Sequence, residues 1–526
     1  MNGRSWKVAI ALLALTAAAC TSTHSAGAPQ GDKLVDGRTF NMSVDTDLGN
    51  LNPFTTVLSA ASAFDQFLFE GLINEDASGK LVPELAEVFD ADLTTARFTI
   101  RSGIKCSDGS PFTAADAAAT FNWVANPTNK AAILGQLVQV GTKATADEAS
   151  RSVTVISGQP DSFLLKDLGS VPMVCRNALQ NPKLLSAGKG GTGLFQLGET
   201  VAGDHYTLNR RHDYAWGPGD WKNNQPGLLV EPQLALDAPV VDLKQLRGLQ
   251  PLAVRTFDIG VVQLTGEQQV GDRGRVGDHL RDHLFRQAGH PGADVNVRRA
   301  LVQALNLPQV GKVLTSGEGK PADQLLAGDI PPPCPGDTVT GNIPAMDVNA
   351  AKAALDAAGW LVGADGYRAR QGSQLKLSLA HFTSPGRQTE AVELIQQQLK
   401  QIGVRVEVKS GDGVAFNHVV VAGTWDMALV GVGEDLPSQL VPLFSGPTFA
   451  QGGKNLGDVS NPEYDALVKR ASATPGKAGC DLWNQAESAL IKRVDIVPFY
   501  MLPVPLYGHG AKFAAVQFPW SIRMTG

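Results

Sequence analysis

Helix-like and strand-like patterns alternate along the second half of the chain, and this alternation restricts the fold more than any other feature. Asp347 is placed to cap a helix that ends near Gly359, and alternate residues of 375–379 are leucines, as in a strand. A second helix is predicted over 391–402, and a strand follows over 404–409, where valines alternate with charged residues. Such units are typical of α/β lobes with parallel-rich sheets.

The length of the chain predicts two or three lobes, because 526 residues are too many for one compact core. Hydrophobic residues make up 43% and charged residues 18%, an ordinary balance for a folded protein. The formal net charge is −6, and no long basic run is present that would neutralise phosphates. We therefore expect no nucleic-acid partner.

The first half of the chain contains shorter signals of the same kind. Residues 40–45 and 97–101 alternate as strands do, and residues 64–72 have helical spacing. Thr113 and Asp116, three residues apart, match the pair that caps the first turn of a helix.

Residues 271–292 are rich in Arg, Asp, His and Gly, and we interpret them as a polar surface connection. They contain His279 and His283, with Asp278 and Asp282 beside them, a spacing that on a helix would turn two imidazoles toward one metal ion. No further ligand set accompanies them, so a solvated surface is expected and no metal site is predicted. We expect no cofactor either, and the absence of a Gly-x-Ser-x-Gly motif argues against an exported hydrolase.

The first twenty residues indicate export. Arg4 and Lys7 precede an apolar run over 8–19 that is too short to span a bilayer. The run ends at Cys20 in a pattern that resembles a bacterial lipoprotein box, with Cys20 as the lipidated residue, although Ala17 replaces the usual leucine. Plain secretion with an incidental cysteine is the alternative. No later segment is long and apolar enough to predict a membrane span.

Export also bears on the other four cysteines. Thiols in an oxidising compartment are expected to pair, and three connectivities are open. Free buried cysteines are the alternative, since thiols also serve as small apolar core groups. Their spacing matches no CxxC metal pattern. These cysteines are Cys106, Cys175, Cys334 and Cys480.

Several segments, in order along the chain, resemble the extracytoplasmic solute-binding proteins of the dipeptide and oligopeptide ABC transporter family. The run over 108–116, for example, follows the family pattern Asp-Gly-x-Pro-h-Thr-Ala-x-Asp, where h is apolar. Any one segment is a weak signal, but the ordered set is specific and covers nearly all of the chain after residue 40. The matching segments are 80–86, 97–105, 107–116, 191–195, 209–217, 294–305, 357–360 and 461–465.

The resemblance implies an α/β fold of the type II periplasmic-binding-protein class, with two α/β lobes, an extra inserted subdomain and a ligand cleft between the lobes. Within that architecture the favoured disulfide pairs are Cys106–Cys175, in the inserted lobe II, and Cys334–Cys480, in lobe III. The expected boundaries are 1–20 for the signal peptide, 21–36 for a flexible tether, 37–62, 187–268 and 498–526 for lobe I, 63–186 for lobe II, and 269–497 for lobe III.

The resemblance also implies that the lobes close around the ligand by a hinge motion. Gly191, Thr192 and Gly193 would lie where a strand crosses between lobes, and glycine tolerates the dihedral changes that a hinge needs. An ordinary turn at this position is the alternative.

In peptide-binding members of the family a carboxylate anchors the α-ammonium group of an extended ligand, in a segment that follows a buried strand. Asp435 is the predicted anchor here and Glu434 the second choice, with a solvated acidic loop as the alternative. Val432 stands where the family has a pocket tryptophan, so a peptide with bulky side chains need not be the ligand. The candidate ligand-binding residues are Trp425, Gly431, Val432, Gly433, Glu434 and Asp435.

The function that the resemblance implies is therefore capture and not catalysis. We expect a monomeric lipoprotein, held in the periplasm or on the outer face of the cell membrane by its lipid. It would bind a small peptide or similar solute and deliver it to the permease and ATPase of an ABC importer. The alternative is an envelope lipoprotein of the same fold that has lost transport and kept a sensing, regulatory or scaffold role. Val432 and the irregular stretch over 271–292 favour that alternative.

Overall fold

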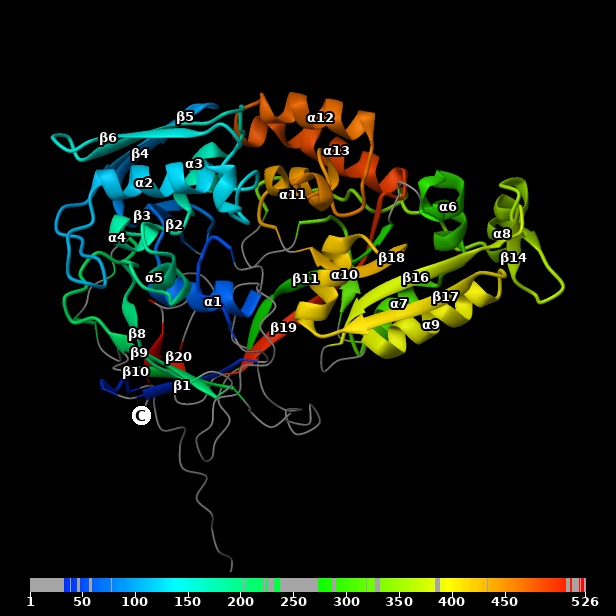
Figure 1. Cartoon of the computed structure of the whole chain (residues 1–526), viewed down its shortest axis with the longest axis horizontal. Helices are drawn as coiled ribbons and strands as arrows, with labels where there is room; N and C mark the ends of the chain where they lie inside the picture. Colours follow the sequence, from blue (N-terminus) through cyan, green and yellow to red (C-terminus); the bar gives the residue numbers. More distant parts are fainter. Residues whose placement is uncertain are drawn as a thin grey trace, which may run out of the picture.

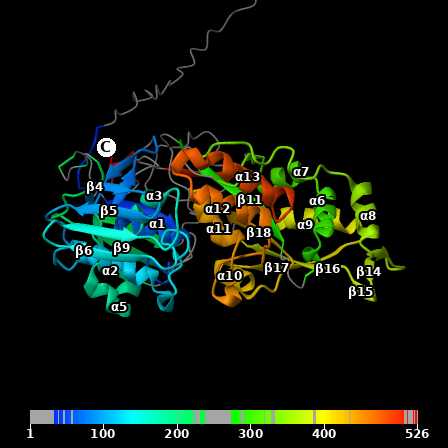
Figure 2. The same ribbon diagram turned by 90° about the horizontal axis from the view of Figure 1, so that it is seen from above.

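The computed structural model has two groups of elements that lie side by side (Figures 1 and 2). We call them the N-terminal lobe, residues 33–236 with 520–524, and the C-terminal lobe, residues 273–507. The structure describes residues 33–37, 39–44, 48–55, 59–76, 78–201, 204–219, 221, 224–225, 231–236, 273–285, 290–317, 319–326, 332–383, 388–432, 434–507, 511–512, 520 and 522–524.

Short strands and helices build the N-terminal lobe. In chain order they are β1 (Thr39–Val44), α1 (Ser59–Leu68), β2 (Ile73–Glu75), β3 (Leu81–Pro83), β4 (Ala86–Ala91), β5 (Thr95–Ile100), α2 (Ala114–Ala125), β6 (Lys143–Asp147), β7 (Ser152–Ile156), α3 (Leu164–Gly169), α4 (Arg176–Leu179), α5 (Pro182–Ser186), β8 (Phe195–Val201), β9 (His205–Arg210) and β10 (Glu231–Leu236).

Eight strands of this lobe form two four-stranded sheets, and β2 pairs with β3 in a separate two-stranded sheet. One has the order β1-β10-β9-β8, with β1 parallel to β10, and the other is antiparallel in the order β4-β5-β7-β6. Helix α2 packs on β6 and β7. The capping pair predicted from the sequence is confirmed, because the Thr113 N–H donates to Asp116 Oδ2 (3.0 Å) at the start of α2.

One hydrophobic core runs through the N-terminal lobe, from Leu48 to Trp216, and includes Trp520 and Ile522 from the end of the chain. The segments expected for lobes I and II therefore share a core. The Tyr214 hydroxyl donates to the buried carboxylate of Glu70, and Trp520 Nε1 donates to the Tyr214 hydroxyl (2.7 Å). These bonds tie the C-terminal residues to the N-terminal lobe, while the three-lobe division stays a prediction.

The C-terminal lobe alternates helices and strands as its sequence predicts. Its elements are β11 (Arg273–Phe285), α6 (Val295–Gln303), α7 (Leu307–Leu314), β12 (Lys320–Pro321), α8 (Val348–Ala357), β13 (Leu361–Val362), β14 (Arg368–Arg370), β15 (Ser373–Gln374), β16 (Lys376–Phe382), α9 (Gln388–Lys400), β17 (Arg405–Gly411), α10 (Gly413–Ala422), β18 (Met427–Val432), α11 (Pro437–Phe444), α12 (Pro462–Ser472), α13 (Cys480–Lys492) and β19 (Ile496–Tyr507).

The local signals in this lobe act as expected. The Asp347 carboxylate accepts from the N–H groups of Asn349 (3.0 Å) and Ala350 (2.9 Å) and caps α8. Gly403 follows α9 with a φ of +77°, a backbone conformation that favours glycine, and so turns the chain into β17.

Strand β11 corrects the interpretation of residues 271–292 as a surface connection. It lies inside a six-stranded sheet of order β12-β19-β11-β18-β16-β17 and pairs antiparallel with both β18 and β19. The polar composition of the segment masked a strand whose backbone groups are paired on both sides. The sheet is mixed, since only β16 pairs in parallel with β17 and β18.

The expected boundary at residue 498 falls inside β19. This strand pairs with β11 from Ile496 to Tyr507, so it belongs to the C-terminal lobe over its whole length. Of the described residues after it, Trp520 and Ile522 pack in the core of the N-terminal lobe.

The four cysteines form the two disulfides favoured by the resemblance. Cys106 pairs with Cys175 inside the N-terminal lobe, with an S–S distance of 1.99 Å. Cys334 pairs with Cys480 at the start of α13 in the C-terminal lobe, with an S–S distance of 2.09 Å. Cys20 lies outside the described residues.

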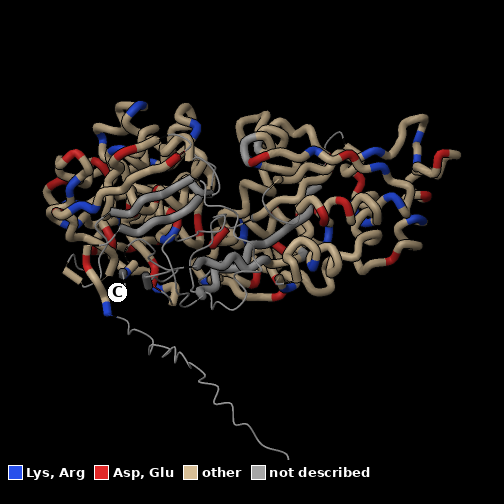
Figure 3. Tube along the Cα trace, turned by 90° about the horizontal axis from the view of Figure 1, so that it is seen from below, with Lys and Arg blue, Asp and Glu red and all other residues tan. Residues whose placement is uncertain are grey.

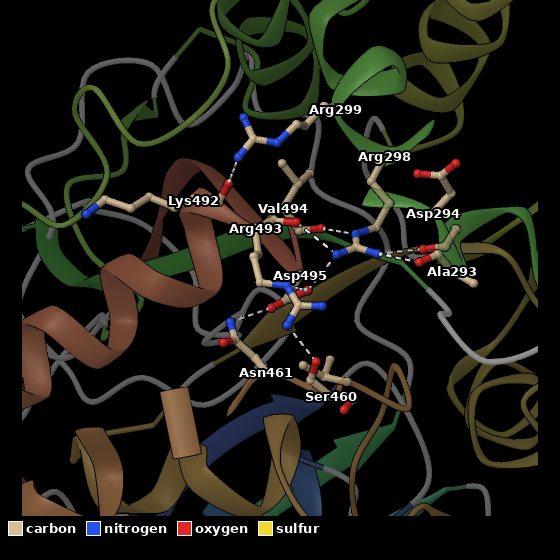
Figure 4. A network of polar contacts seen from close by, with 12 residues as sticks. Ala293, Asp294, Arg298, Arg299, Ser460, Asn461, Lys492, Arg493, Val494 and Asp495 are labelled. Atoms are coloured by element: carbon tan, nitrogen blue, oxygen red, sulfur yellow. Dashed lines mark hydrogen bonds and ion pairs between the residues drawn. The ribbon is translucent and has the colours of Figure 1, made fainter. Parts of the chain in front are cut away.

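A buried arginine ties three parts of the C-terminal lobe together (Figure 4). Arg298 of α6 is 0% exposed, forms an ion pair with Asp495 (2.8 Å) and donates to the main-chain oxygens of Gly292 (2.7 Å) and Val494 (2.8 Å). Asn461, at the start of α12, donates to the other Asp495 oxygen (2.8 Å). Each charge is paired and hydrogen-bonded, the condition for keeping charges in a core.

Removal of this arginine should destabilise the C-terminal lobe strongly. We expect Arg298→Met to lower the free energy of unfolding by about 3–5 kcal/mol, because it removes the fully buried ion pair that compensates Asp495. The matched control is Arg299→Met at the neighbouring exposed position, which should change it by about 0.5 kcal/mol or less. Urea unfolding followed by tryptophan fluorescence measures both, and equal losses would contradict the assignment.

Candidate functional site

The chain leaves β18 and meets the N-terminal lobe before it enters α11. We call residues 434–439, which are the link after β18 and the first residues of α11, the junction segment. Helix α3 of the N-terminal lobe lies beside α11 and α12 of the C-terminal lobe in both ribbon views (Figures 1 and 2). The predicted anchors Glu434 and Asp435 thus lie where the two lobes touch.

Glu434 faces the opposite lobe through a side-chain bridge. Gln136, in the loop after α2, donates from Nε2 to Glu434 Oε1 (2.8 Å), and its Oε1 accepts from Lys454 Nζ (3.1 Å). Lys454 also donates to the main-chain oxygen of Ala132. One carboxamide of the N-terminal lobe is therefore held between an acid and a base of the C-terminal lobe.

Burial shifts the titration of both charged groups of this bridge. It raises the pKa of Glu434 to about 8; the charge of Asp435 adds to the rise, and Lys454 and the Gln136 hydrogen bond oppose it. Burial lowers the pKa of Lys454 to about 8, against the attraction of Glu434. Both pKa shifts show that nearby opposite charges and hydrogen bonds do not fully offset the cost of burying the charged side chain. Such shifted pKa values are frequent in binding sites.

Asp435 differs from its neighbour. It is exposed, and its main-chain N–H donates to Gln439 Oε1 (3.2 Å), as does the N–H of Leu436 (3.3 Å). Gln439 is buried in the first turn of α11 and so holds the backbone of the junction segment. Of the two predicted anchors, Glu434 is the half-buried one, and it is the one that contacts the other lobe.

The remaining predicted binding residues are placed less favourably. Trp425 is 0% exposed, and its indole Nε1 donates to Val420 O (3.1 Å), so its side chain packs the core and we assign it no ligand contact. Gly431 and Val432 lie in β18, paired with Arg281 and Leu280 of β11. Gly433 lies outside the described residues.

The predicted hinge residues pack against the end of α1. A Cβ on Gly191 would lie 1.9 Å from Leu68 O, and a Cβ on Gly193 would lie 2.5 Å from Phe67 O. Thr192 between them is fully buried. Glycine is needed here because two backbones touch, and all these contacts lie within the N-terminal lobe. The hinge role stays a prediction.

The sequence analysis did not identify several residues that form contacts between the two lobes. Gln136, Asp167, Gln439 and Lys454 belong to no motif and come from distant parts of the chain. Asp167 of α3 is 0% exposed and accepts from Gln439 Nε2 (2.7 Å). No periodicity or spacing identifies such residues, because only the docking of two lobes brings them together.

Other features of the described residues do not compete with the junction. Two surface hollows, of about 430 and 480 Å³, lie between α9 and β17 and between α12 and α13. Basic and acidic residues are interspersed along the coloured part of the chain in Figure 3. Within the described ranges no group of three or more His, Cys, Asp or Glu could hold a metal ion. In the same ranges no helix has the length and apolar character of a membrane span.

The comparisons with known proteins agree with this architecture. The model of the bacterial extracellular solute-binding proteins, family 5 Middle, matches residues 80–231 and 263–451, more than half of the chain. The periplasmic murein peptide-binding protein MppA of Escherichia coli is 24% identical over 527 residues, which cover 94% of this chain and 93% of MppA.

Two solved structures share the fold. A substrate-binding protein of Microbacterium hydrocarbonoxydans, in complex with 4-hydroxybenzoate hydrazide, has a TM-score of 0.73 at 20% identity, covering 93% of this chain and 100% of that one. A dipeptide-binding protein of Pseudoalteromonas sp. SM9913, in complex with Met-Leu, has a TM-score of 0.70 at 19% identity, with the same coverage. The fold is thus that of type II periplasmic binding proteins, and the chain belongs to family 5 of the bacterial extracellular solute-binding proteins, which bind solutes and are not enzymes.

Proposed function

We propose that this protein captures a small peptide, or a similar solute that carries an amine, between its two lobes. The observation that carries the proposal is Glu434, a carboxylate that the end of β18 presents to the N-terminal lobe, where Gln136 donates to it. A ligand ammonium in the place of the Gln136 amide would compensate this acid better than a neutral donor does. Asp435, next in the chain, would add a second negative charge.

The names of the relatives support this class of ligand. MppA is named for murein peptides, and the Pseudoalteromonas protein holds the dipeptide Met-Leu. The Microbacterium protein holds a hydrazide, so the fold also accepts small solutes that are not peptides. In the present chain, Val432 replaces the tryptophan expected at this place, so a peptide with bulky side chains need not be the ligand.

The wider role that we propose is delivery to an ABC importer. The lobes would close on the ligand by a hinge movement and present it to a permease and its ATPase. A lipid on Cys20 would hold the monomeric protein at the outer face of the cell membrane. The family match, the names of the relatives and the apolar run before Cys20 support this role.

The ligand itself can be tested directly. Native mass spectrometry of the chain without its lipid should show co-purified species in the mass range of small peptides, which denaturation releases. A protein that carries nothing, and whose thermal stability no member of a broad peptide and solute library raises, would contradict the proposal. Such a result would favour the transport-defunct role in sensing or scaffolding.

The anchor can be tested by removal of one charge. Glu434→Gln keeps an acceptor for Gln136 but cannot pair with an ammonium, so binding of an α-amino ligand should weaken by about 2–5 kcal/mol. Asp435→Asn should weaken it less, because Asp435 is exposed. Isothermal titration with a captured peptide and with its N-acetylated form measures both effects. Equal affinity of the two peptides for the wild-type protein would move the anchor elsewhere.

The raised pKa of Glu434 predicts how the stability of the ligand-free protein depends on pH. Between the ordinary pKa near 4.5 and the folded pKa of about 8, the folded state holds a proton that the unfolded state has lost. Stability should therefore be highest below this window and fall as pH rises through it, by at most about 1.4 kcal/mol per pH unit for this group. Glu434→Gln should make the thermal unfolding profile from pH 5 to 8 less steep, while Glu70 and Glu487, whose pKa values burial raises to about 7, keep part of the slope.

Glu463→Gln, at an exposed position of α12, is the control for this experiment and should keep the wild-type profile. A profile of Glu434→Gln that stays parallel to that of the wild type would show that Glu434 does not titrate in this range.

A further inference from the structure

A carboxylate of the N-terminal lobe is buried against the first turn of α11. Asp167, on α3, is 0% exposed, and both of its oxygens accept from the C-terminal lobe. Ser438 Oγ donates to Oδ2 (3.1 Å) and Gln439 Nε2 donates to Oδ1 (2.7 Å). Since Ser438 and Gln439 are each 6% exposed, the contact excludes most of the solvent from these groups.

The Gln439 carboxamide forms hydrogen bonds both to the opposite lobe and to the backbone of the junction segment. Its Nε2 donates across the lobe boundary to Asp167, and its Oε1 accepts from the main-chain N–H groups of Asp435 (3.2 Å) and Leu436 (3.3 Å). The Asp167 contact fixes the amide plane and, with it, the direction of the oxygen. The backbone next to Glu434 is therefore held by a group whose orientation depends on the opposite lobe.

We propose that Asp167 and Gln439 form a clamp between the lobes that orders the junction segment, residues 434–439, only when the lobes are together. Asp167 and Gln439 are then positioning residues: they touch no ligand, but they fix the backbone that carries the anchor. Closure and assembly of the binding site become one event. The role of this coupling in solute uptake rests on the proposed function. The clamp itself is independent of the proposed function.

The surroundings of Asp167 explain why separation of the lobes would release it. Burial, and next the charge of Asp161, raise its pKa well above the ordinary range. Asp161 is itself 3% exposed, and its Oδ1 accepts from the Phe163 N–H (2.8 Å). The nearest opposite charge on α3, Lys166, is paired with Glu75 of β2 (3.0 Å). Ser438 and Gln439 of α11 donate to Asp167 from the opposite lobe, whereas Asp161, its carboxyl neighbour in its own lobe, raises its pKa. Opening of the lobes would therefore replace the two α11 donors by water.

Amide hydrogen exchange on the ligand-free protein tests the clamp. In Asp167→Ala, exchange at Asp435 and Leu436 should accelerate by about tenfold or more, because the amide of Gln439 is no longer held. Exchange in the last turn of α11, near Phe444, should stay as in the wild type. Asp167→Asn keeps an oxygen that accepts from Gln439, and it should restore slow exchange.

Ser162→Ala is the matched control from the same region. It removes a different hydrogen bond between the lobes, from Ser162 Oγ to Ala471 O (2.6 Å), that does not touch the junction segment. This variant should leave exchange at Asp435 and Leu436 unchanged. Circular dichroism and thermal unfolding confirm that each variant is folded. If Asp167→Ala does not fold, Gln439→Glu places a second carboxylate against Asp167 and should enlarge the radius of gyration in small-angle scattering.

Unchanged exchange in Asp167→Ala, an equal acceleration in Ser162→Ala, or an unchanged radius of gyration in Gln439→Glu would overturn the clamp. None of these measurements needs a ligand. If these measurements give the expected results but the protein captures no solute, the clamp would be supported and only the proposed function would be contradicted.

Discussion

The backbone pairing of β11 with β18 and β19 is the constraint on which the arrangement of the site depends. This strand lies inside the six-stranded sheet, and its partners come from residues about 150 and 220 positions further along the chain. Its pairing sets the direction of β18, whose end carries the junction segment to the N-terminal lobe. Because an unpaired backbone group inside a sheet costs about as much as a lost hydrogen bond, β11 holds β18 in register.

At three places in the molecule, a buried charged or polar group is compensated by an ion pair or hydrogen bonds. Arg298 and Asp495 compensate each other in the C-terminal lobe, Glu70 accepts from Tyr214 and Trp216 in the N-terminal lobe, and Asp167 meets α11 between them. The first two networks lie within a lobe and stabilise it in every state. The third exists only where the lobes meet, so the same chemistry serves there to couple the lobes and the binding segment.

Much of the fold could be predicted from local signals. The caps at Thr113 and Asp347 and the helix end at Gly403 depend on neighbouring residues alone, and the structure confirms them. The family motifs also led to the disulfide pairs. The segment that forms β11 was misinterpreted, because polar residues in a paired strand look like a surface loop until its partners are known.

The sequence by itself determined the family, the secondary structure of the C-terminal lobe and the acidic pair Glu434 and Asp435, since each rests on neighbouring residues or on their order. Only the tertiary structure decided that Glu434 is the more buried acid, that Gln136 and Lys454 accompany it, and that Asp167 holds Gln439. These contacts join residues about 270 to 320 positions apart. The physical reason is that burial and hydrogen bonding across a lobe boundary depend on the docked surfaces, which no local pattern encodes.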